Sequence, residues 1–99
     1  MTIKLINRIT EGELLLEGRL NSTNYEEAYE IFKQAAEKFD SLIINMTGLE
    51  YISSAGLRSL KQLYILMQKK QGELVIRGAN PNITEVMEMT GFSSIFRME

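Results

Sequence analysis

This chain is organised around ten residues, Tyr51-Ile-Ser-Ser-Ala-Gly-Leu-Arg-Ser-Leu60. Two apolar residues lead into a pair of serines, and beyond Gly56 the apolar residues recur at helical spacing of three and four. A hydroxyl that opens a helix lies where backbone N–H groups lack intrahelical partners, at the electropositive end of the helix dipole. The stretch therefore predicts a strand that ends at a serine-bearing helix start.

Strands are expected on both sides of this helix. The apolar run at residues 41–46 is typical of a buried central strand, and residues 47–50 are expected to form the loop that leads to the serines. The helix is expected to end near Lys69, with Gly72 as its stop, and residues 73–77 predict the next strand. This order of elements indicates a parallel crossover connection.

The remaining elements are expected at the two ends of the chain. Residues 3–9 and 13–20 predict a hairpin with Gly12 at positive φ in its turn. An amphipathic stripe predicts a helix over residues 25–39, and Pro81 predicts the start of a third helix that Gly91 ends, before a short last strand within 95–98. We therefore predict the α/β class, as a single domain over residues 1–99 with a mixed sheet of four to five strands and about three helices.

Composition excludes several classes of function. Of the 99 residues 44% are hydrophobic and 24% charged, as in an ordinary globular protein. The net charge of −2, with no dense basic cluster, argues against nucleic acid and against an anionic membrane surface as partners. No apolar run approaches the roughly 20 residues of a membrane helix, so no membrane insertion is expected. A cytoplasmic protein is the interpretation that fits.

Catalysis is not expected, because the chain contains neither histidine nor cysteine. A serine nucleophile usually needs a histidine base, and zinc sites usually need imidazole or thiolate ligands. The serine stretch also lacks the glycines and lysine of a phosphate-binding loop. The carboxylate pairs Glu26-Glu27 and Glu11/Glu13 are expected to be solvated. No catalytic residue, metal, cofactor or small-molecule substrate is therefore predicted, and on pattern alone Ser54 could be a helix cap and nothing more.

A family resemblance adds to this interpretation. The segment Leu49–Leu60 resembles the signature of the STAS domain, the fold of bacterial anti-sigma factor antagonists. Gly18-Arg-Leu-Asn21 is similar to the family's turn before the first helix, and residues 42–46 are similar to its central strand. Residues 72–76 resemble the strand after the signature helix, and residues 83–92 its last helix. These segments occur in the family's order and at matching spacing, so the resemblance covers nearly the whole chain.

The resemblance implies a regulator of transcription that acts through protein–protein contacts. Such antagonists bind an anti-sigma factor that is also a serine protein kinase, which frees the sigma factor, and phosphorylation of a serine at the start of the second helix ends the binding. By position that serine is Ser54, with Ser53 as the alternative. The partner-binding residues that the resemblance implies are Asn21, Ser53, Ser54, Ala55, Gly56 and Arg58.

Two positions depart from the family's pattern. Asn21 and Ser53 stand where regulated members often carry aspartates near the target serine. The resemblance therefore also leaves open a STAS subunit that is not phosphorylated and that binds a transporter ATPase or another signalling complex.

Overall fold

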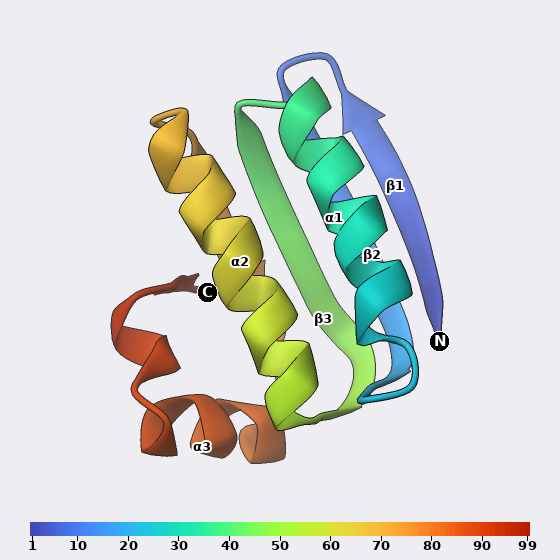
Figure 1. The fold of residues 1–99 in the computed structure, drawn as a ribbon, viewed down its shortest axis with the longest axis vertical. Coiled ribbons are helices and arrows are strands. Elements are labelled where there is room, and N and C mark those ends of the chain that lie inside the picture. Colours follow the sequence, from blue (N-terminus) through green and yellow to red (C-terminus); the bar gives the residue numbers. More distant parts are fainter.

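A five-stranded sheet in the order β1-β2-β3-β4-β5 organises the computed structural model, which describes residues 1–99 (Figure 1). β1 (Thr2–Arg8) and β2 (Glu11–Leu20) form the predicted antiparallel hairpin. β3 (Ser41–Ile52), β4 (Glu73–Arg77) and β5 (Arg97–Met98) extend the sheet in parallel from β2. The α/β class, the mixed sheet and the parallel crossover between β3 and β4 are therefore confirmed.

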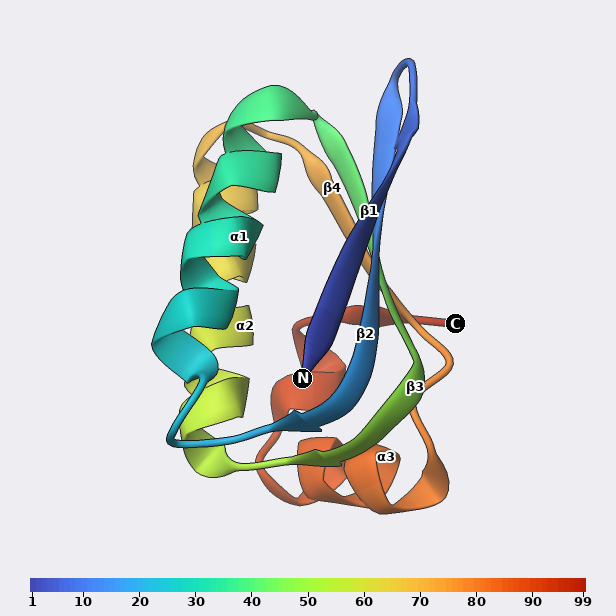
Figure 2. The same cartoon turned by 90° about the vertical axis from the view of Figure 1, so that its right-hand side faces the viewer.

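The helices cover one face of this sheet. α1 (Tyr25–Lys38) and α2 (Ser54–Lys69) lie side by side on that face, and α3 (Pro81–Met89) lies across one end of it (Figure 2). A 3-10 turn, η1 (Phe92–Ser94), leads from α3 to β5. The hydrophobic core fills the space between helices and sheet. Its largest fully buried side chains include Phe32, Leu14, Leu16, Ile44, Met46, Leu60 and Leu63.

The central strand is longer than its sequence indicated. Residues 47–50 were expected to form a loop, and that prediction is wrong, because β3 continues to Ile52. The polar Thr47-Gly48 pair resembles a turn, but β2 supplies a backbone partner for this part of β3, with Gly18 opposite Leu49 and a register shift after Leu15. Leu49 is buried on the core side. Pairing between distant segments therefore overrides the local turn signal.

The hairpin turn also differs from the prediction. Gly12 was expected to hold positive φ in the turn, but it lies inside β2 opposite Asn7. The turn consists of Ile9 and Thr10, and Ile9 takes the left-handed conformation with φ of 44°. An isoleucine rarely adopts this region, so local sequence preferences did not indicate it.

α2 ends at Lys69, as predicted, but the left-handed residue after it is not the expected glycine. Gln71, and not Gly72, takes the left-handed conformation with φ of 57°. The Gln71 N–H donates to the carbonyl of Gln68 at 3.0 Å, and the Gly72 N–H donates to the carbonyl of Met67 at 2.8 Å. This pair of bonds is the Schellman arrangement, which satisfies the last carbonyls of the helix.

Candidate functional site

The candidate site lies at the end of the sheet where β2 and β3 finish and lead into α1 and α2. In open α/β sheets this carboxyl end of the parallel strands is the usual place for binding sites. Figure 2 shows the two connecting loops at the same end of the molecule. The Ser53 N–H donates to the carbonyl of Leu20 at 2.9 Å. This bond brings the turn that begins at Asn21 beside the serine pair, a contact that the family resemblance only implied.

The two serines have different structural roles. Ser53 is the N-cap of α2: its backbone is extended, and its Oγ accepts a hydrogen bond from the Gly56 N–H at 3.2 Å. Ser54 is the first helical residue, and its side chain is exposed and takes part in none of the chain's hydrogen bonds. The interpretation of Ser54 as the helix cap is therefore wrong, because Ser53 fills that role. The Ser54 hydroxyl remains free in solvent.

Gly56 allows α2 to pack closely on the sheet. It is buried, and a Cβ at this position would lie 2.8 Å from Leu20 Cγ, 2.9 Å from Ile52 Cγ1 and 3.0 Å from the Leu20 carbonyl oxygen. Real Cβ atoms essentially never come so close, so the absence of a side chain is what permits this contact. Of its neighbours, Ala55 is half-buried, and Ser59 is buried with its Oγ donating to the Gly56 carbonyl at 2.6 Å.

Asn21 builds the turn before α1. Its Oδ1 accepts from the Thr23 N–H at 3.0 Å and from the Thr23 hydroxyl at 2.6 Å. Its own N–H donates to Asn24 Oδ1 at 2.9 Å. The side chain is thus engaged within the turn, and no hydrogen bond joins it to Ser54. Asn21 contributes to the surface beside Ser54 through the position of its turn.

The start of α2 is electropositive. Its first turn contains no acidic residue, so no side chain offsets the positive end of the helix dipole. Arg58 is exposed and lies four residues after Ser54, and residues at this spacing are neighbours on a helix surface. Both features favour a negatively charged group at Ser54. The hydroxyl, the free N–H groups and the cation together form a surface that can accept an anion.

Arg19 and Tyr51 extend this surface, although the sequence did not single them out as a pair. They are opposite each other on β2 and β3, and the Arg19 guanidinium lies 4.3 Å from the centre of the Tyr51 ring. Tyr51 is 40% exposed. Beside it, a groove of about 190 Å³ runs toward α3 and is lined mainly by Tyr51, Ile52, Ile83 and Val86. Arg19 lies in the segment Gly18–Asn21 and Tyr51 in the segment Leu49–Leu60, but only the strand register shows that they are in contact.

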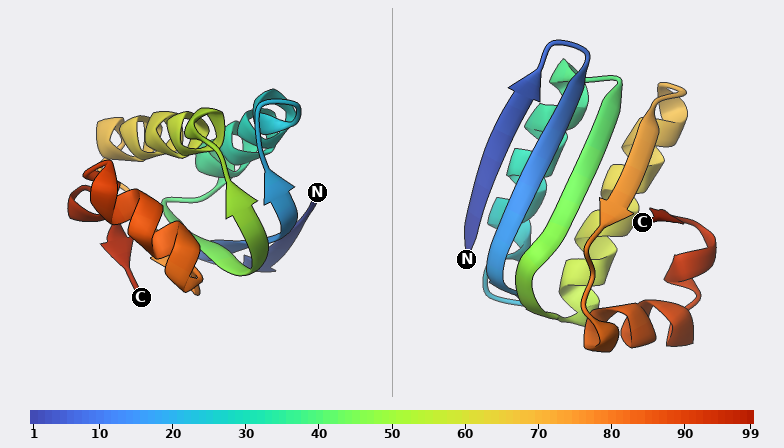
Figure 3. Two further views of the ribbon diagram at one scale, coloured as in Figure 1. Left: turned by 90° about the horizontal axis from the view of Figure 1, so that it is seen from below. Right: turned by 180° about the vertical axis from the view of Figure 1, so that it is seen from behind.

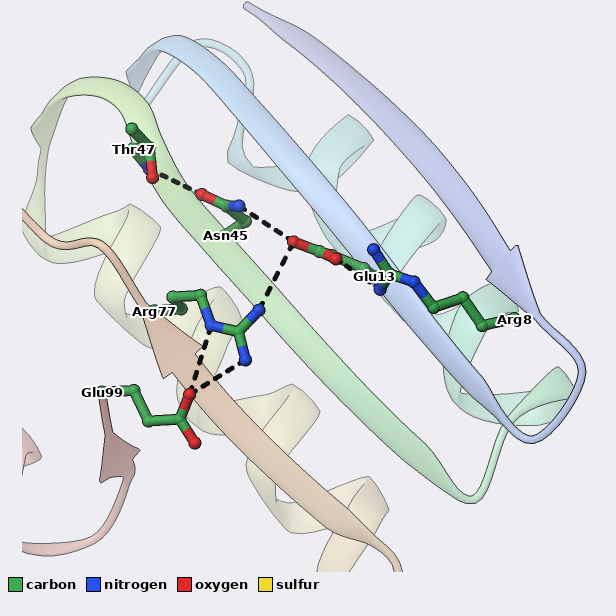
Figure 4. A network of polar contacts seen from close by, with 6 residues as sticks. All are labelled: Arg8, Glu13, Asn45, Thr47, Arg77 and Glu99. Carbon is green, nitrogen blue, oxygen red and sulfur yellow. Dashed lines mark hydrogen bonds and ion pairs between the residues drawn. The ribbon is translucent and has the colours of Figure 1, made fainter.

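A second polar cluster lies on the face of the sheet that no helix covers (Figure 4). Its centre is Glu13, whose Oε2 accepts from Asn45 Nδ2 at 2.9 Å and lies 4.0 Å from Arg77. Arg8 forms an ion pair with the other oxygen, and Arg77 is also paired with Glu99 at 2.9 Å. Glu13 is only 4% exposed, so the expectation that it is solvated is wrong. Arg8 on β1, Asn45 on β3 and Arg77 on β4 surround it.

These contacts determine the protonation of Glu13. The hydrogen bond from Asn45 is the largest effect and lowers the pKa of Glu13 below its ordinary value, while burial opposes this and the nearby Arg8 and Arg77 add to it. The carboxylate is therefore charged at neutral pH. Glu26 and Glu27 are exposed at the start of α1, as expected, and no group of three acidic side chains forms a metal-ligand cluster. None of the helices has the length and apolar character that crossing a membrane requires.

Comparison with known proteins shows the family. The STAS domain family matches residues 4–99. BtrV of Bordetella bronchiseptica, named as a candidate anti-sigma factor antagonist, is 38% identical over 97 residues, which cover 95% of this chain and 84% of BtrV.

Solved structures share the fold at low sequence identity. A candidate anti-sigma factor antagonist of Thermotoga maritima is 15% identical, with a TM-score of 0.91 over 97% of this chain and 84% of that one. The Bacillus cell fate determinant SpoIIAA in its phosphorylated form is 16% identical, with a TM-score of 0.75 over 99% of this chain and 91% of that one. These findings confirm the resemblance that the sequence motifs indicated. The chain belongs to the STAS domain family, among the anti-sigma factor antagonists.

Proposed function

We propose that this protein binds an anti-sigma factor of the serine-kinase type through the surface around Ser54, and that this binding releases a sigma factor. We further propose that the kinase phosphorylates Ser54 and thereby ends the binding. The observation that carries the proposal is that the two serines have different roles. Ser53 caps the helix, and Ser54 has an exposed hydroxyl without a hydrogen-bond partner. The similarity to BtrV supports the same type of partner.

The exposed Ser54 hydroxyl would take the phosphoryl group directly from ATP. Ser54 Oγ would attack the γ-phosphorus of ATP held by the kinase, the bond from that phosphorus to the bridging oxygen would break, and ADP would leave with the electron pair. The hydroxyl proton would pass to a base on the kinase, because this chain contains no histidine that could accept it. Ser54 lies at the surface, so a kinase active site can reach it without unfolding α2.

The phosphate would act on the partner interface and not on the fold. It adds about −1.5 to −2 charges at neutral pH, and at a helix N-terminus such a charge is favourable by about 0.3–1 kcal/mol. In a complex packed against Ala55 and the start of α2, the same dianion would be desolvated without a partner. A loss of about 3 kcal/mol weakens binding more than a hundredfold, which is sufficient for a switch. SpoIIAA matches this fold both without and with phosphate, at TM-scores of 0.78 and 0.75.

The test uses the kinase-type anti-sigma factor from the protein's own genome. After incubation with ATP, mass spectrometry is expected to place phosphate on Ser54 in the wild type and in Ser53→Ala, and to find none in Ser54→Ala. In a binding assay Ser54→Ala is expected to keep its affinity, and Ser54→Asp to lose it by more than about tenfold. Phosphate on Ser53 alone, or full binding by both Ser54→Asp and the phosphorylated protein, would refute the switch.

A second candidate function rests on the turn at Asn21. Its side chain is neutral and engaged with Thr23, and Ser53 is likewise neutral, so both positions lack the carboxylates that often flank the target serine. This favours a constitutive subunit of a transporter ATPase or another signalling complex. Affinity capture with the intact protein that recovers such an ATPase, and no anti-sigma factor, would support this candidate against the first. A cytoplasmic location suits both and stays a prediction from the sequence.

A further inference from the structure

Exposed apolar side chains gather on one edge of the sheet. Among the large apolar residues, Met1, Leu5 and Ile6 are 43%, 44% and 37% exposed, and Ile9 at the hairpin turn is 97% exposed. All lie in or beside β1, whose outer edge has no neighbouring strand (Figure 3, right). The opposite edge, β5, is only two residues long. The unprotected apolar edge of this sheet is therefore β1.

β1 lacks most of the features that usually protect an edge strand. Proteins shield such edges by making them short, by a bulge, by proline or by a covering loop. β1 runs for seven residues in unbroken register with β2, from Thr2 to Arg8, and contains no proline. Its two cations already have partners, since Lys4 lies 4.0 Å from Glu17 and Arg8 is paired with Glu13. Arg8 is thus held by a buried carboxylate, whereas the exposed Lys4–Glu17 contact screens the charge of Lys4 only in part.

The backbone groups on this edge are self-complementary. The hairpin has a two-residue turn closed by the pair Arg8 and Glu11. In such a hairpin the closing pair is hydrogen-bonded, and bonded and non-bonded pairs then alternate along the strands. The N–H and C=O groups of Ile3, Leu5 and Asn7 consequently point away from β2. This set is symmetric about Leu5, so an antiparallel copy of the same strand would satisfy every member.

We propose that β1 pairs with β1 of a second copy of this chain, on a two-fold axis that passes beside Leu5 and is perpendicular to the sheet. Leu5 would lie opposite its own copy, and Ile3 opposite Asn7 of the second copy. The two sheets would join into one of ten strands. Antiparallel edge pairing of this kind is an isologous contact, which closes at two copies and leaves no free β1 edge.

The shape of the molecule supports this occupant. A hollow of about 310 Å³ lies between β1 and α1 and is lined by Met1, Thr2, Ile3, Asn24, Glu27 and Ile31. With Leu5 on the axis, residue numbers of opposed positions sum to ten, so Ile9 of one copy comes level with Met1 of the other. The most exposed apolar side chain would thus come beside this hollow, where Met1, Ile3 and Ile31 supply its apolar contacts. An unrelated strand would need both matching backbone groups along β1 and an apolar side chain level with the hollow beside Met1.

The proposed pairing goes beyond the partner-binding function and does not obstruct it. In Figure 1 the start of α2 lies at the end of the sheet opposite the hairpin turn, and β1 lies at the far edge from α2. Antiparallel pairing would therefore place the two Ser54 surfaces at opposite ends of the joined sheet. Both helical layers would lie on the same face. Each copy could still bind its own anti-sigma factor.

The mass of the intact protein in solution tests the proposal first. Analytical ultracentrifugation is expected to show a concentration-dependent dimer, with twice the 11.3 kDa mass of the chain. Leu5→Lys places two like charges at the axis and is expected to weaken dimerisation at least about tenfold. Ile65→Lys is the matched control, because Ile65 is 42% exposed but lies on α2, and it is expected to leave the dimer unchanged. A wild-type protein that stays monomeric would overturn the proposal.

Hydrogen exchange then tests the geometry. In the dimer the amides of Ile3, Leu5 and Asn7 are expected to be protected and to exchange rapidly on dilution to monomer, while those of Lys4 and Ile6 stay protected by β2. A dimer in which the first three amides exchange freely would contradict the pairing. If Leu5→Lys fails to fold, Ile9→Gln serves instead, because this exposed turn residue contributes no core contact and its loss is also expected to weaken the dimer.

Discussion

The two serines at the start of α2 should respond differently to the same truncation. Ser53→Ala removes the oxygen that accepts from the Gly56 N–H, and that N–H then lacks a partner. Losing a serine N-cap typically costs about 1 kcal/mol, within about 0.5–2 kcal/mol. The bond of 3.2 Å is at the long end for N–H···O contacts and is only partly buried. We therefore expect Ser53→Ala to lower the free energy of unfolding by about 0.5–1 kcal/mol.

Ser54→Ala is the matched comparison. The Ser54 side chain is exposed and takes no part in the chain's hydrogen bonds, and alanine is the better helix former. The free energy of unfolding of Ser54→Ala should therefore differ from that of the wild type by less than about 0.5 kcal/mol. For a chain of this length the entropy of unfolding is about 0.2 kcal/mol per kelvin. Ser53→Ala should therefore lower Tm by about 2–5 °C, and Ser54→Ala should leave it nearly unchanged.

Urea unfolding followed by far-UV circular dichroism measures both effects, provided that the m-values agree so that the midpoints report stability alone. Two further variants strengthen the test. Ser53→Asp keeps a capping oxygen and should retain the wild-type stability. Ser53→Gly should lower the free energy of unfolding by only about 0.3 kcal/mol. An equal loss for Ser54→Ala and Ser53→Ala would refute the assignment of Ser53 as the cap, and so would a Ser53→Asp variant as unstable as Ser53→Ala.

Three other changes test the packing, the polar cluster and the end of α2. Gly56→Ala should lower the free energy of unfolding by about 1–2 kcal/mol despite the better helix propensity of alanine, because its Cβ would press on Leu20; a stabilised variant in urea unfolding would contradict this. The bond from Asn45 lowers the native pKa of Glu13, so its carboxylate stabilises the fold above the ordinary pKa of 4.5 and this contribution is lost as pH falls through the lower native pKa. Glu13→Gln should thus lower the free energy of unfolding by about 1–3 kcal/mol at pH 7 and approach the wild-type stability in acid. A difference in stability between the two proteins that stays constant across pH would contradict this. Gln71→Gly should raise stability by up to about 1 kcal/mol, because glycine adopts the left-handed conformation without strain, whereas a lower Tm would argue against strain at this position.

Much of the architecture could be predicted because local signals and global packing agree. The apolar stripes of α1 and α2 have the helical period, and their inward residues Phe32, Leu60 and Leu63 are fully buried. Gly91 ends the third helical region at φ of 80°, as expected of a glycine stop. The parallel crossover followed from the strand-helix-strand order alone. In each case the residues that specify an element lie within it or next to it.

The candidate site was predicted in position but not in detail. The motif around Ser54 located it, and the roles assigned to Asn21, Ser53, Ser54, Ala55, Gly56 and Arg58 in partner binding stay predictions. The pairing of Arg19 with Tyr51 was missed, because it depends on the register between β2 and β3. The burial of Glu13 was missed for a similar reason. Its partners Asn45 and Arg77 are distant in sequence, so no local pattern could show that a carboxylate on an uncovered sheet face is enclosed.

The amino-acid sequence alone was sufficient to predict the order and type of most elements and the family. These properties depend on composition and on short-range periodicity, which the backbone expresses locally. Three features became clear only from the fold: which serine caps α2, where β3 ends and which backbone edge stays open. Each of those outcomes depends on a contact between distant segments: the Ser53–Leu20 bond, the pairing of residues 47–52 with β2, and the unpaired outer edge of β1.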